Sequence, residues 1–168
     1  MKTLRFLSVA LLLMGGVAPR LSAGQAPIRK ALVITAHNLT AEAAPNRDAK
    51  SMARPGDEIR YTLVFTNLTA GSVKNVQFVD PIPAGLVYVL GSAAARQSVR
   101  VEYSIDGGKA YAEQPMIAAI ENGKTVEQPA PRERYTHVRW TVLESVAPGA
   151  QVTAEFRTQV NAAPGEAK

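Results

Sequence analysis

Residues 55–89 read PGDEIRYTLVFTNLTAGSVKNVQFVDPIPAGLVYV, and they contain the clearest structural signals of the chain. It opens on a Pro-Gly-Asp turn and runs into a strand that ends at Asn67. A polar linker, a second strand and a proline-rich turn ending in Gly85 follow. Such residues govern how strands are joined. The stretch therefore predicts β-structure, and it identifies no substrate.

Alternation of apolar and polar residues continues along the chain. It predicts strands with period 2 at 59–65, 99–105, 138–142 and 152–160. Shorter apolar runs predict further strands at 32–36, 76–79 and 86–90. Turn signals separate these segments; they include Asp106-Gly107, which we expect to form a tight hairpin turn, and Glu121-Asn122-Gly123. Many short strands with turns between them predict an antiparallel β-sandwich or barrel.

Two stretches depart from this pattern. Residues 41–54 are rich in alanine and mixed in charge, which fits a loop, an edge strand or a short helix. Residues 113–134 contain three prolines and extend the domain beyond a minimal sandwich. We predict a short strand at 117–120 within this segment. Long loops of this kind are either functional or mobile.

The amino terminus has the features of a secretory signal peptide. Lys2 and Arg5 precede an apolar run at 6–18, and Ala23 offers a small residue at the cleavage position. Cleavage after Ala26 is an alternative. A membrane anchor is the other interpretation, but the run is shorter than the ~20 residues that span a bilayer. We expect an exported protein, periplasmic or secreted, with no stable membrane insertion after cleavage.

Cleavage would also change the charge of the protein. The signal removes Lys2, Arg5 and Arg20, so 16 of the 19 basic residues remain against 14 acidic ones, a balance of +2. These charges are interleaved along the strands, whereas nucleic-acid binding proteins cluster them on one face. We therefore expect no nucleic-acid partner. The chain has no cysteine, so its core must form without disulfides.

The residues that suggest chemistry have adequate structural explanations. Asp57, Asp80 and Asp106 are candidate calcium ligands, but the chain lacks an Asp-x-Asp-x-Asp-Gly run. His37 and His137 lie within strand patterns, where we expect ordinary half-buried side chains. No serine or cysteine nucleophile motif is present. We expect no catalytic residue, metal site or cofactor, and thus no enzyme.

One further segment has a local resemblance. Residues 104–111, SIDGGKAY, are similar to the Asp-box hairpin Ser-x-Asp-x-Gly-x-Thr-aromatic, with Ala110 in place of the threonine. That motif is a folding device placed away from catalytic chemistry. We interpret the segment as a plain β-hairpin.

With these residues in view, the chain resembles the DUF11 domain of bacterial surface and secreted proteins. The motif residues that carry the resemblance are Pro55, Gly56, Asp57, Asn67, Asp80, Pro83, Gly85, Trp140, Pro148 and Gly149. The resemblance covers about residues 55–160. It implies an immunoglobulin-like sandwich that has no established catalytic residues and that often occurs in tandem copies. Here there is a single copy, with an enlarged segment near 92–135.

The motif residues have physical reasons to occur where they do. Gly56 and Gly85 supply backbone conformations that a Cβ atom would penalise. We expect Asp57, Asn67 and Asp80 to bond with nearby backbone amides and so to fix turns and strand ends. The motif is therefore predicted to be structural.

We divide the chain into a signal peptide at 1–23, an N-terminal segment at 24–54, a sandwich domain at 55–160 and a flexible tail at 161–168. A strand within 28–40 is expected to join the sandwich. The predicted function is a non-catalytic structural or protein-interaction module of the cell envelope or extracellular space, with another envelope or secreted protein as partner. The contact would use a sheet edge or the 113–134 segment.

The alternative function is binding of a glycan or small ligand, assisted by calcium. Tyr111 and Tyr135 flank the long segment and are the candidate interaction residues, because they are the aromatic side chains that we expect to be exposed.

Overall fold

Strands make up most of the described chain. The structure is a computed structural model that describes residues 31–48 and 52–161. The predicted signal peptide lies outside these residues, as does the tail beyond Asn161. Two antiparallel sheets form the body of the domain and a third, two-stranded sheet stands apart. The described residues thus have an all-β, sandwich-like fold, as the alternating pattern predicts.

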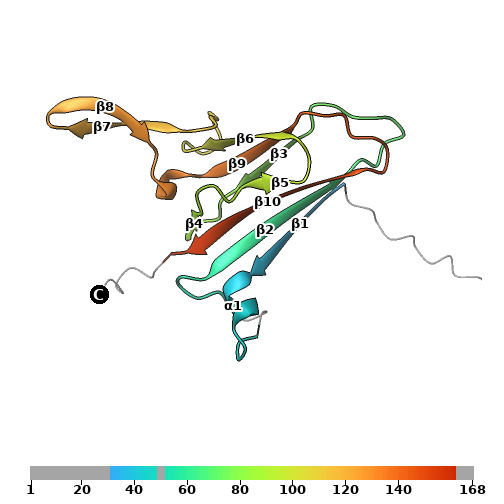
Figure 1. The fold of residues 1–168 in the computed structure, drawn as a ribbon, viewed down its shortest axis with the longest axis horizontal. Helices are drawn as coiled ribbons and strands as arrows, with labels where there is room; N and C mark the ends of the chain where they lie inside the picture. The colour runs from blue at the N-terminus through green and yellow to red at the C-terminus, as the bar shows by residue number, and fades with distance from the viewer. Residues whose placement is uncertain (1–30, 49–51, 162–168) are drawn as a thin grey trace, which may run out of the picture.

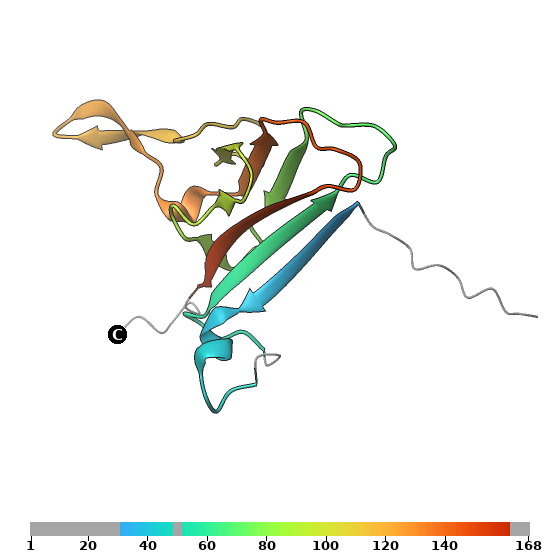
Figure 2. The same cartoon turned by 45° about the vertical axis from the view of Figure 1, so that its right-hand side comes forward.

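The larger sheet follows the order β1-β2-β10-β4, and β5 also pairs with β10. Its strands are β1 (Leu32–Asn38), β2 (Glu58–Thr66), β10 (Gln151–Val160), β4 (Leu86–Tyr88) and β5 (Ala94–Ala95). The long strands β2 and β10 lie side by side through the middle of the molecule (Figure 1). The expected strand within 28–40 is confirmed as β1, which forms the edge of this sheet (Figure 2).

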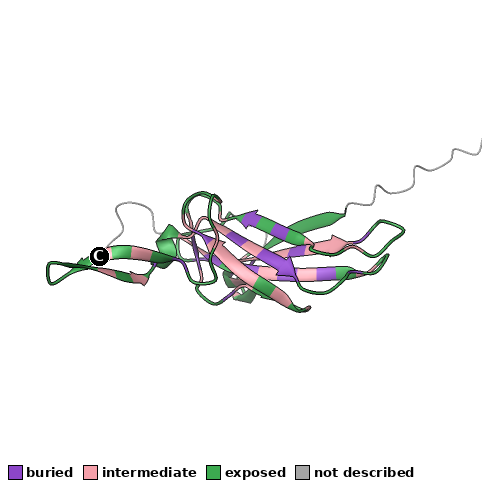
Figure 3. Cartoon of the chain, turned by 90° about the horizontal axis from the view of Figure 1, so that it is seen from above, coloured by how far each residue is buried: buried purple, intermediate pink, exposed green. Residues whose placement is uncertain are grey.

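The second sheet covers the inner face of the first. It contains β3 (Gln77–Pro81), β9 (His137–Val142) and β6 (Val99–Ser104), with β9 in the middle. Figure 3 shows the strands from above, with the buried residues concentrated in the body of the domain. All pairings are antiparallel.

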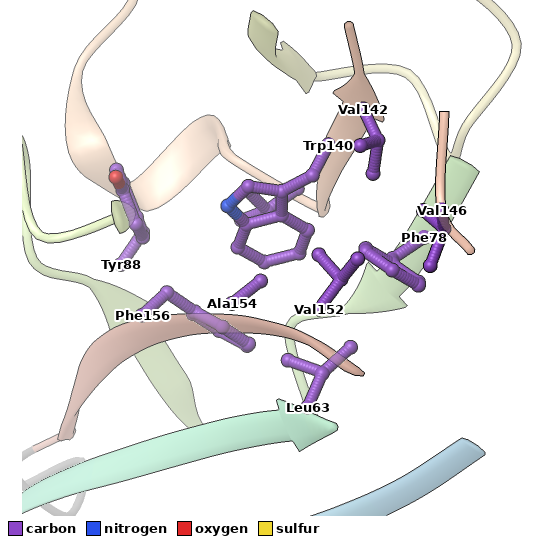
Figure 4. Packing of buried hydrophobic residues seen from close by; sticks show 10 residues of the cluster. Leu63, Phe78, Tyr88, Trp140, Val142, Val146, Val152, Ala154 and Phe156 are labelled. Carbon is purple, nitrogen blue, oxygen red and sulfur yellow. The ribbon is translucent and has the colours of Figure 1, made fainter. Parts of the chain in front are cut away.

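The core lies between these two sheets. Trp140 and Phe156 are fully buried, and their ring centroids are 5.8 Å apart. Leu63 and Val152 lie beneath the indole in Figure 4, and Tyr88 closes one end of the cluster. Leu63, Trp140, Val152 and Phe156 have the apolar parity of their strands, so alternation selected the correct face at these positions.

The two stretches without clear periodicity now have defined structures. Within residues 41–54, the short-helix interpretation is confirmed in part, because α1 (Leu39–Ala43) starts just before that segment. The long segment contains β7 (Met116–Glu121) and β8 (Lys124–Pro129), followed by a 3-10 turn at Arg132–Arg134. The predicted strand at 117–120 is confirmed as part of β7, whereas the sequence did not predict β8. None of the helices in the described ranges is long and apolar enough to cross a membrane.

Candidate interaction surface

Asp57 bonds with a nearby backbone amide, as predicted, and is also the centre of a buried polar network that the sequence did not predict. Its Oδ2 atom accepts a hydrogen bond from the Arg54 amide at 2.8 Å and from Asn38 Nδ2 at 2.7 Å. The Arg47 guanidinium binds both carboxylate oxygens, at 2.7 and 2.6 Å. These hydrogen bonds from Arg47 hold the pKa of Asp57 well below its ordinary value. The carboxylate therefore ties the 41–54 segment to β2.

Asn67 joins two loops at the opposite end of β2. Its Nδ2 atom donates to the carbonyls of Gly71 at 2.8 Å and Val146 at 2.9 Å, and its Oδ1 accepts from the Thr69 amide at 3.0 Å. The Gly149 amide donates to the Asn67 carbonyl at 2.8 Å, which brings the Pro148-Gly149 turn into the same contact. The structural roles predicted for Asn67 and for this turn are confirmed.

Asp80 does not have the role predicted for it. It lies within β3 opposite Val138, faces the core and is only 8% exposed. Its Oδ2 atom has no hydrogen-bond partner, so the carboxylate does not fix a strand end. Burial raises the pKa of Asp80, and the charge of His137 opposes this shift in part. The expectation of a turn-fixing aspartate is wrong because the strand continues to Pro81 with Asp80 on its inner face.

The other motif positions lie in turns or in the core. Gly56 and Gly85 have φ values of 86° and 84°, as the sequence predicts. The Leu86 amide closes the second turn by donating to the Pro83 carbonyl at 3.1 Å. Pro55 precedes Gly56 in the first turn. Trp140 is buried at the middle of the core, and its Nε1 atom has no hydrogen-bond partner.

The histidines and acidic residues do not gather into a site. His37 is exposed rather than half-buried and lies 2.9 Å from Glu42, so the expectation for this side chain is wrong. His137 is half-buried, as expected, and its Nδ1 atom lies 3.1 Å from Thr136 Oγ1. Over residues 31–48 and 52–161, no group of three or more His, Asp or Glu side chains is arranged to hold a metal ion.

Asp106 organises the loop that follows β6. Its Oδ1 atom accepts hydrogen bonds from the Lys109 and Ala110 amides, each at 3.0 Å, and from Ser104 Oγ at 2.7 Å. The loop closes where Tyr103 bridges to Ala112. The tight two-residue turn expected at Asp106-Gly107 is therefore wrong, because side-chain bonding supports a wider loop.

Tyr111 lies on this loop and is half-buried, which corrects its expected exposure. The Arg139 guanidinium carbon sits 4.0 Å from the centre of its ring, and Arg139 in turn forms an ion pair with Glu102 at 2.9 Å. Such cation–π contacts hold a ring in place. Tyr111 also lines a shallow pocket of about 270 Å³ that reaches Met116, the first residue of β7.

Tyr135 packs against the core instead of facing solvent. Its ring is half-buried and lies 5.3 Å from Tyr88 and 5.2 Å from Tyr103, measured between centroids. Burial is also the main cause that raises the pKa of Tyr135. The exposure expected of this residue is therefore wrong, and its interaction role stays a prediction.

The projecting hairpin, defined here as β7 and β8 with their turn, is the feature that most resembles a contact surface. It extends away from both sheets in Figures 1 and 2, and none of its strand residues is buried. Met116, Ala118 and Ile120 alternate along β7 and so share one face. Ile120 is 80% exposed and Met116 is 43% exposed. One face of β7 is therefore apolar and exposed, although the projecting hairpin has no hydrophobic core of its own.

Both strands of the projecting hairpin have a free edge. In the described part of the chain, β7 and β8 pair only with each other. Residues 116–120 read MIAAI and contain no charge, whereas β8 contains Lys124, Glu127 and Pro129. Natural edge strands are usually protected by lysine, proline or a bulge. Apart from Glu121 at its end, β7 has no charged residue, and it has no proline, whereas β8 has both.

The sequence contains a hairpin signal, Asn122-Gly123, but from it only a turn was predicted. Asn122 and Gly123 both have positive φ, 50° and 76°, and they connect Glu121 to Lys124, which are paired residues. Asn-Gly flanked by strands is a strong hairpin signal. The sequence did not predict β8, because its residues KTVEQ are mostly polar and show only weak alternation of apolar and polar side chains.

The geometry defines a class of protein: an antiparallel β-sandwich with a projecting hairpin. No protein-family model matches the chain, and the search of curated proteins finds no relative. The resemblance to the DUF11 domain therefore stays a prediction that rests on the motif residues.

Proposed function

We propose that this protein is a non-catalytic interaction module of the cell envelope or extracellular space, and that it binds a partner protein through the projecting hairpin. The observation that carries the proposal is the exposure of Ile120 and Met116 on an element that pairs with neither sheet and has no buried strand residue. Two-stranded hairpins are at best marginally stable in water. A partner that covers the apolar face would stabilise the hairpin and bury these side chains.

The mode of contact that we propose is strand addition to β7. An incoming strand forms backbone hydrogen bonds with an open edge, and its side chains contact alternate residues of the edge strand. The uncharged run at 116–120 leaves this edge accessible. The pocket lined by Tyr111 and Met116 lies at the base of the projecting hairpin and would receive a side chain of the partner.

The test compares partner capture by three versions of the chain. The wild-type protein, with a photo-crosslinker at position 118, is incubated with an envelope fraction. Ile120→Glu places a charge on the contact face, and Leu143→Glu is the matched control because Leu143 is an apolar residue with 62% exposure outside the hairpin. We expect the wild type and Leu143→Glu to capture the same protein and Ile120→Glu to lose it.

Two outcomes would contradict this function. If Ile120→Glu captures the partner as well as the wild type does, the projecting hairpin is not the contact surface. Failure of the wild type to crosslink any protein would remove the interaction role altogether. Circular dichroism of each variant confirms that the sheets are intact, since Ile120 makes no core contact.

A further inference from the structure

A second concave surface lies on the outer face of the larger sheet, away from the projecting hairpin. It is a pocket of about 390 Å³ bounded by β2, β10 and both residues of β5. Figure 1 shows β2 beside β10, and β5 pairs with the other side of β10. The volume is within the range of small-ligand sites. Its polar side chains are Arg60, Thr62, Arg96, Thr153 and Glu155.

The strand register explains why polar groups gather here. Tyr61 and Phe156 are paired and face the core, so their neighbours Thr62 and Glu155 are paired on the opposite face. Ala94 pairs with Glu155 from the other side. Its short side chain leaves the space that forms the pocket.

The charges of this pocket are not neutralised by one another. Among the described residues, no ion pair or side-chain hydrogen bond involves Arg60, Arg96 or Glu155. The Nε atom of Arg60 is also buried without an acceptor. By contrast, the nearby Arg157 forms an ion pair with Glu58 at 2.7 Å. Arg60 is therefore a partly desolvated cation that has no direct ion pair with any described carboxylate.

A second observation also indicates an anion. Arg60 lies directly opposite Arg157 in the β2–β10 register. Like charges in opposite positions of a sheet destabilise the pairing. Glu58 neutralises Arg157, so Arg60 is the arginine of this pair that lacks an ion-pair partner, and a bound anion beside it would offset the loss of hydration at its guanidinium.

Glu155 limits the kind of anion that fits. A compact ion such as sulfate would be repelled by this carboxylate, which lies in the same pocket. Carboxylate side chains accept hydrogen bonds readily from hydroxyl groups. A ligand with one carboxylate and several hydroxyls would suit this lining. Its carboxylate would pair with the two arginines, and its hydroxyls would form hydrogen bonds with Glu155 and the two threonines.

We infer that this pocket binds a hydroxylated carboxylate, of the class formed by the uronic-acid units of acidic polysaccharides. Arg60 and Arg96 bind the carboxylate, for which the guanidinium fork is geometrically suited. Thr62, Thr153 and Glu155 bind the ring hydroxyls. The site is independent of the projecting hairpin, so the chain has two separate contact surfaces.

The test is an NMR titration of the ¹⁵N-labelled chain with tri-galacturonate, galactotriose and acetate. Galactotriose lacks the carboxylates, and acetate lacks the hydroxyls. We expect tri-galacturonate to shift the amide signals of Thr62 and Thr153, with much weaker effects from the other two probes. Arg60→Gln and Arg96→Gln should each weaken the affinity at least about tenfold, because each removes a charge-assisted contact.

Arg100→Gln is the matched control, because Arg100 is an exposed arginine on β6 in the other sheet. This variant should bind tri-galacturonate like the wild type. The inference is overturned if tri-galacturonate causes no shifts at these amides, if acetate binds equally well, or if Arg60→Gln retains full affinity. The spectrum of each free variant shows whether the sheet is intact, so loss of folding is distinguished from loss of binding.

Discussion

At the residue scale, two buried aspartates of one motif have opposite environments. Asp57 accepts hydrogen bonds from an arginine, an asparagine and a backbone amide. Asp80 is buried with one carboxylate oxygen unpartnered. The same residue type thus stabilises the fold at one position and costs stability at the other. The two positions should respond to pH in opposite directions.

The first prediction concerns Asp57→Asn. The substitution removes the ion pair with Arg47, so at pH 7 we expect the melting temperature to fall by roughly 5–10 °C. Because the folded pKa of Asp57 is lowered, its stabilising contribution is present above the unfolded pKa and is lost as the pH falls toward the folded pKa. The difference between variant and wild type should therefore shrink below about pH 4. Thermal melts from pH 3 to 8 measure this trend, and a constant difference would contradict it.

The second prediction concerns Asp80→Asn, which removes a buried charge. The folded pKa of Asp80 is raised, so its ionisation costs stability once the pH rises through that folded pKa. At pH 7 we expect the variant to be as stable as the wild type or more stable, by up to about 1 kcal/mol. Near pH 3 the wild-type carboxyl is protonated in both states, so the gain should vanish. Urea unfolding at the two pH values tests this, and a less stable variant at pH 7 would refute it.

At the element scale, the projecting hairpin is separable from the sandwich. The Ala130 amide donates to the Pro115 carbonyl at 2.9 Å, so the two ends of the hairpin lie next to each other. Neither strand contributes a residue to the core cluster. The conformation of the projecting hairpin therefore depends on the Asn122-Gly123 turn and on the pairing of β7 with β8.

The third prediction follows from this separation. Replacing residues 116–129 with a Gly-Ser-Gly linker should change the melting temperature by less than about 3 °C, because none of the residues removed is fully buried and none belongs to the core cluster. The same variant should lose the partner that the wild type captures. Ile120→Glu in the full-length chain is the control, since it alters the contact face and keeps the hairpin. A large fall in melting temperature would show that the hairpin supports the sandwich.

At the scale of the whole molecule, one aromatic core joins the two sheets. Phe156 lies 5.0 Å from Tyr61 and 5.8 Å from Trp140, measured between ring centroids, so it contacts both layers. The chain has no cysteine, and this core is therefore the main support of the fold.

The fourth prediction is that Phe156→Ala destabilises the domain by about 3–5 kcal/mol, the usual cost of truncating a buried aromatic side chain. Urea unfolding monitored by Trp140 fluorescence measures the change, because the indole is fully buried in the folded state. Val33→Ala, at a position with 44% exposure on β1, should cost less than about 0.5 kcal/mol. Equal effects at the two positions would refute the assignment of the core.

Alternation in the sequence predicted the main strands because each has one buried face. The pattern at 59–65 became β2 and that at 152–160 became β10. It did not predict β8, since neither face of that strand is buried and its sequence is under no such constraint. The prediction that Tyr135 is exposed was wrong, because its burial depends on rings from β4 and β6.

The β-class of the fold, its apolar faces and the positive-φ turns at Gly56 and Gly85 follow from the sequence, since residue period and backbone sterics are local properties. The choice of neighbouring strands, by contrast, depends on tertiary packing. Tertiary packing brings Arg47 into contact with Asp57 and leaves the Oδ2 atom of Asp80 without a hydrogen-bond partner. It also separates the hairpin from the two main sheets and brings Arg60, Arg96 and Glu155 to one pocket. The reason is that these relations join residues far apart in the chain, and their energies depend on distance and burial after folding.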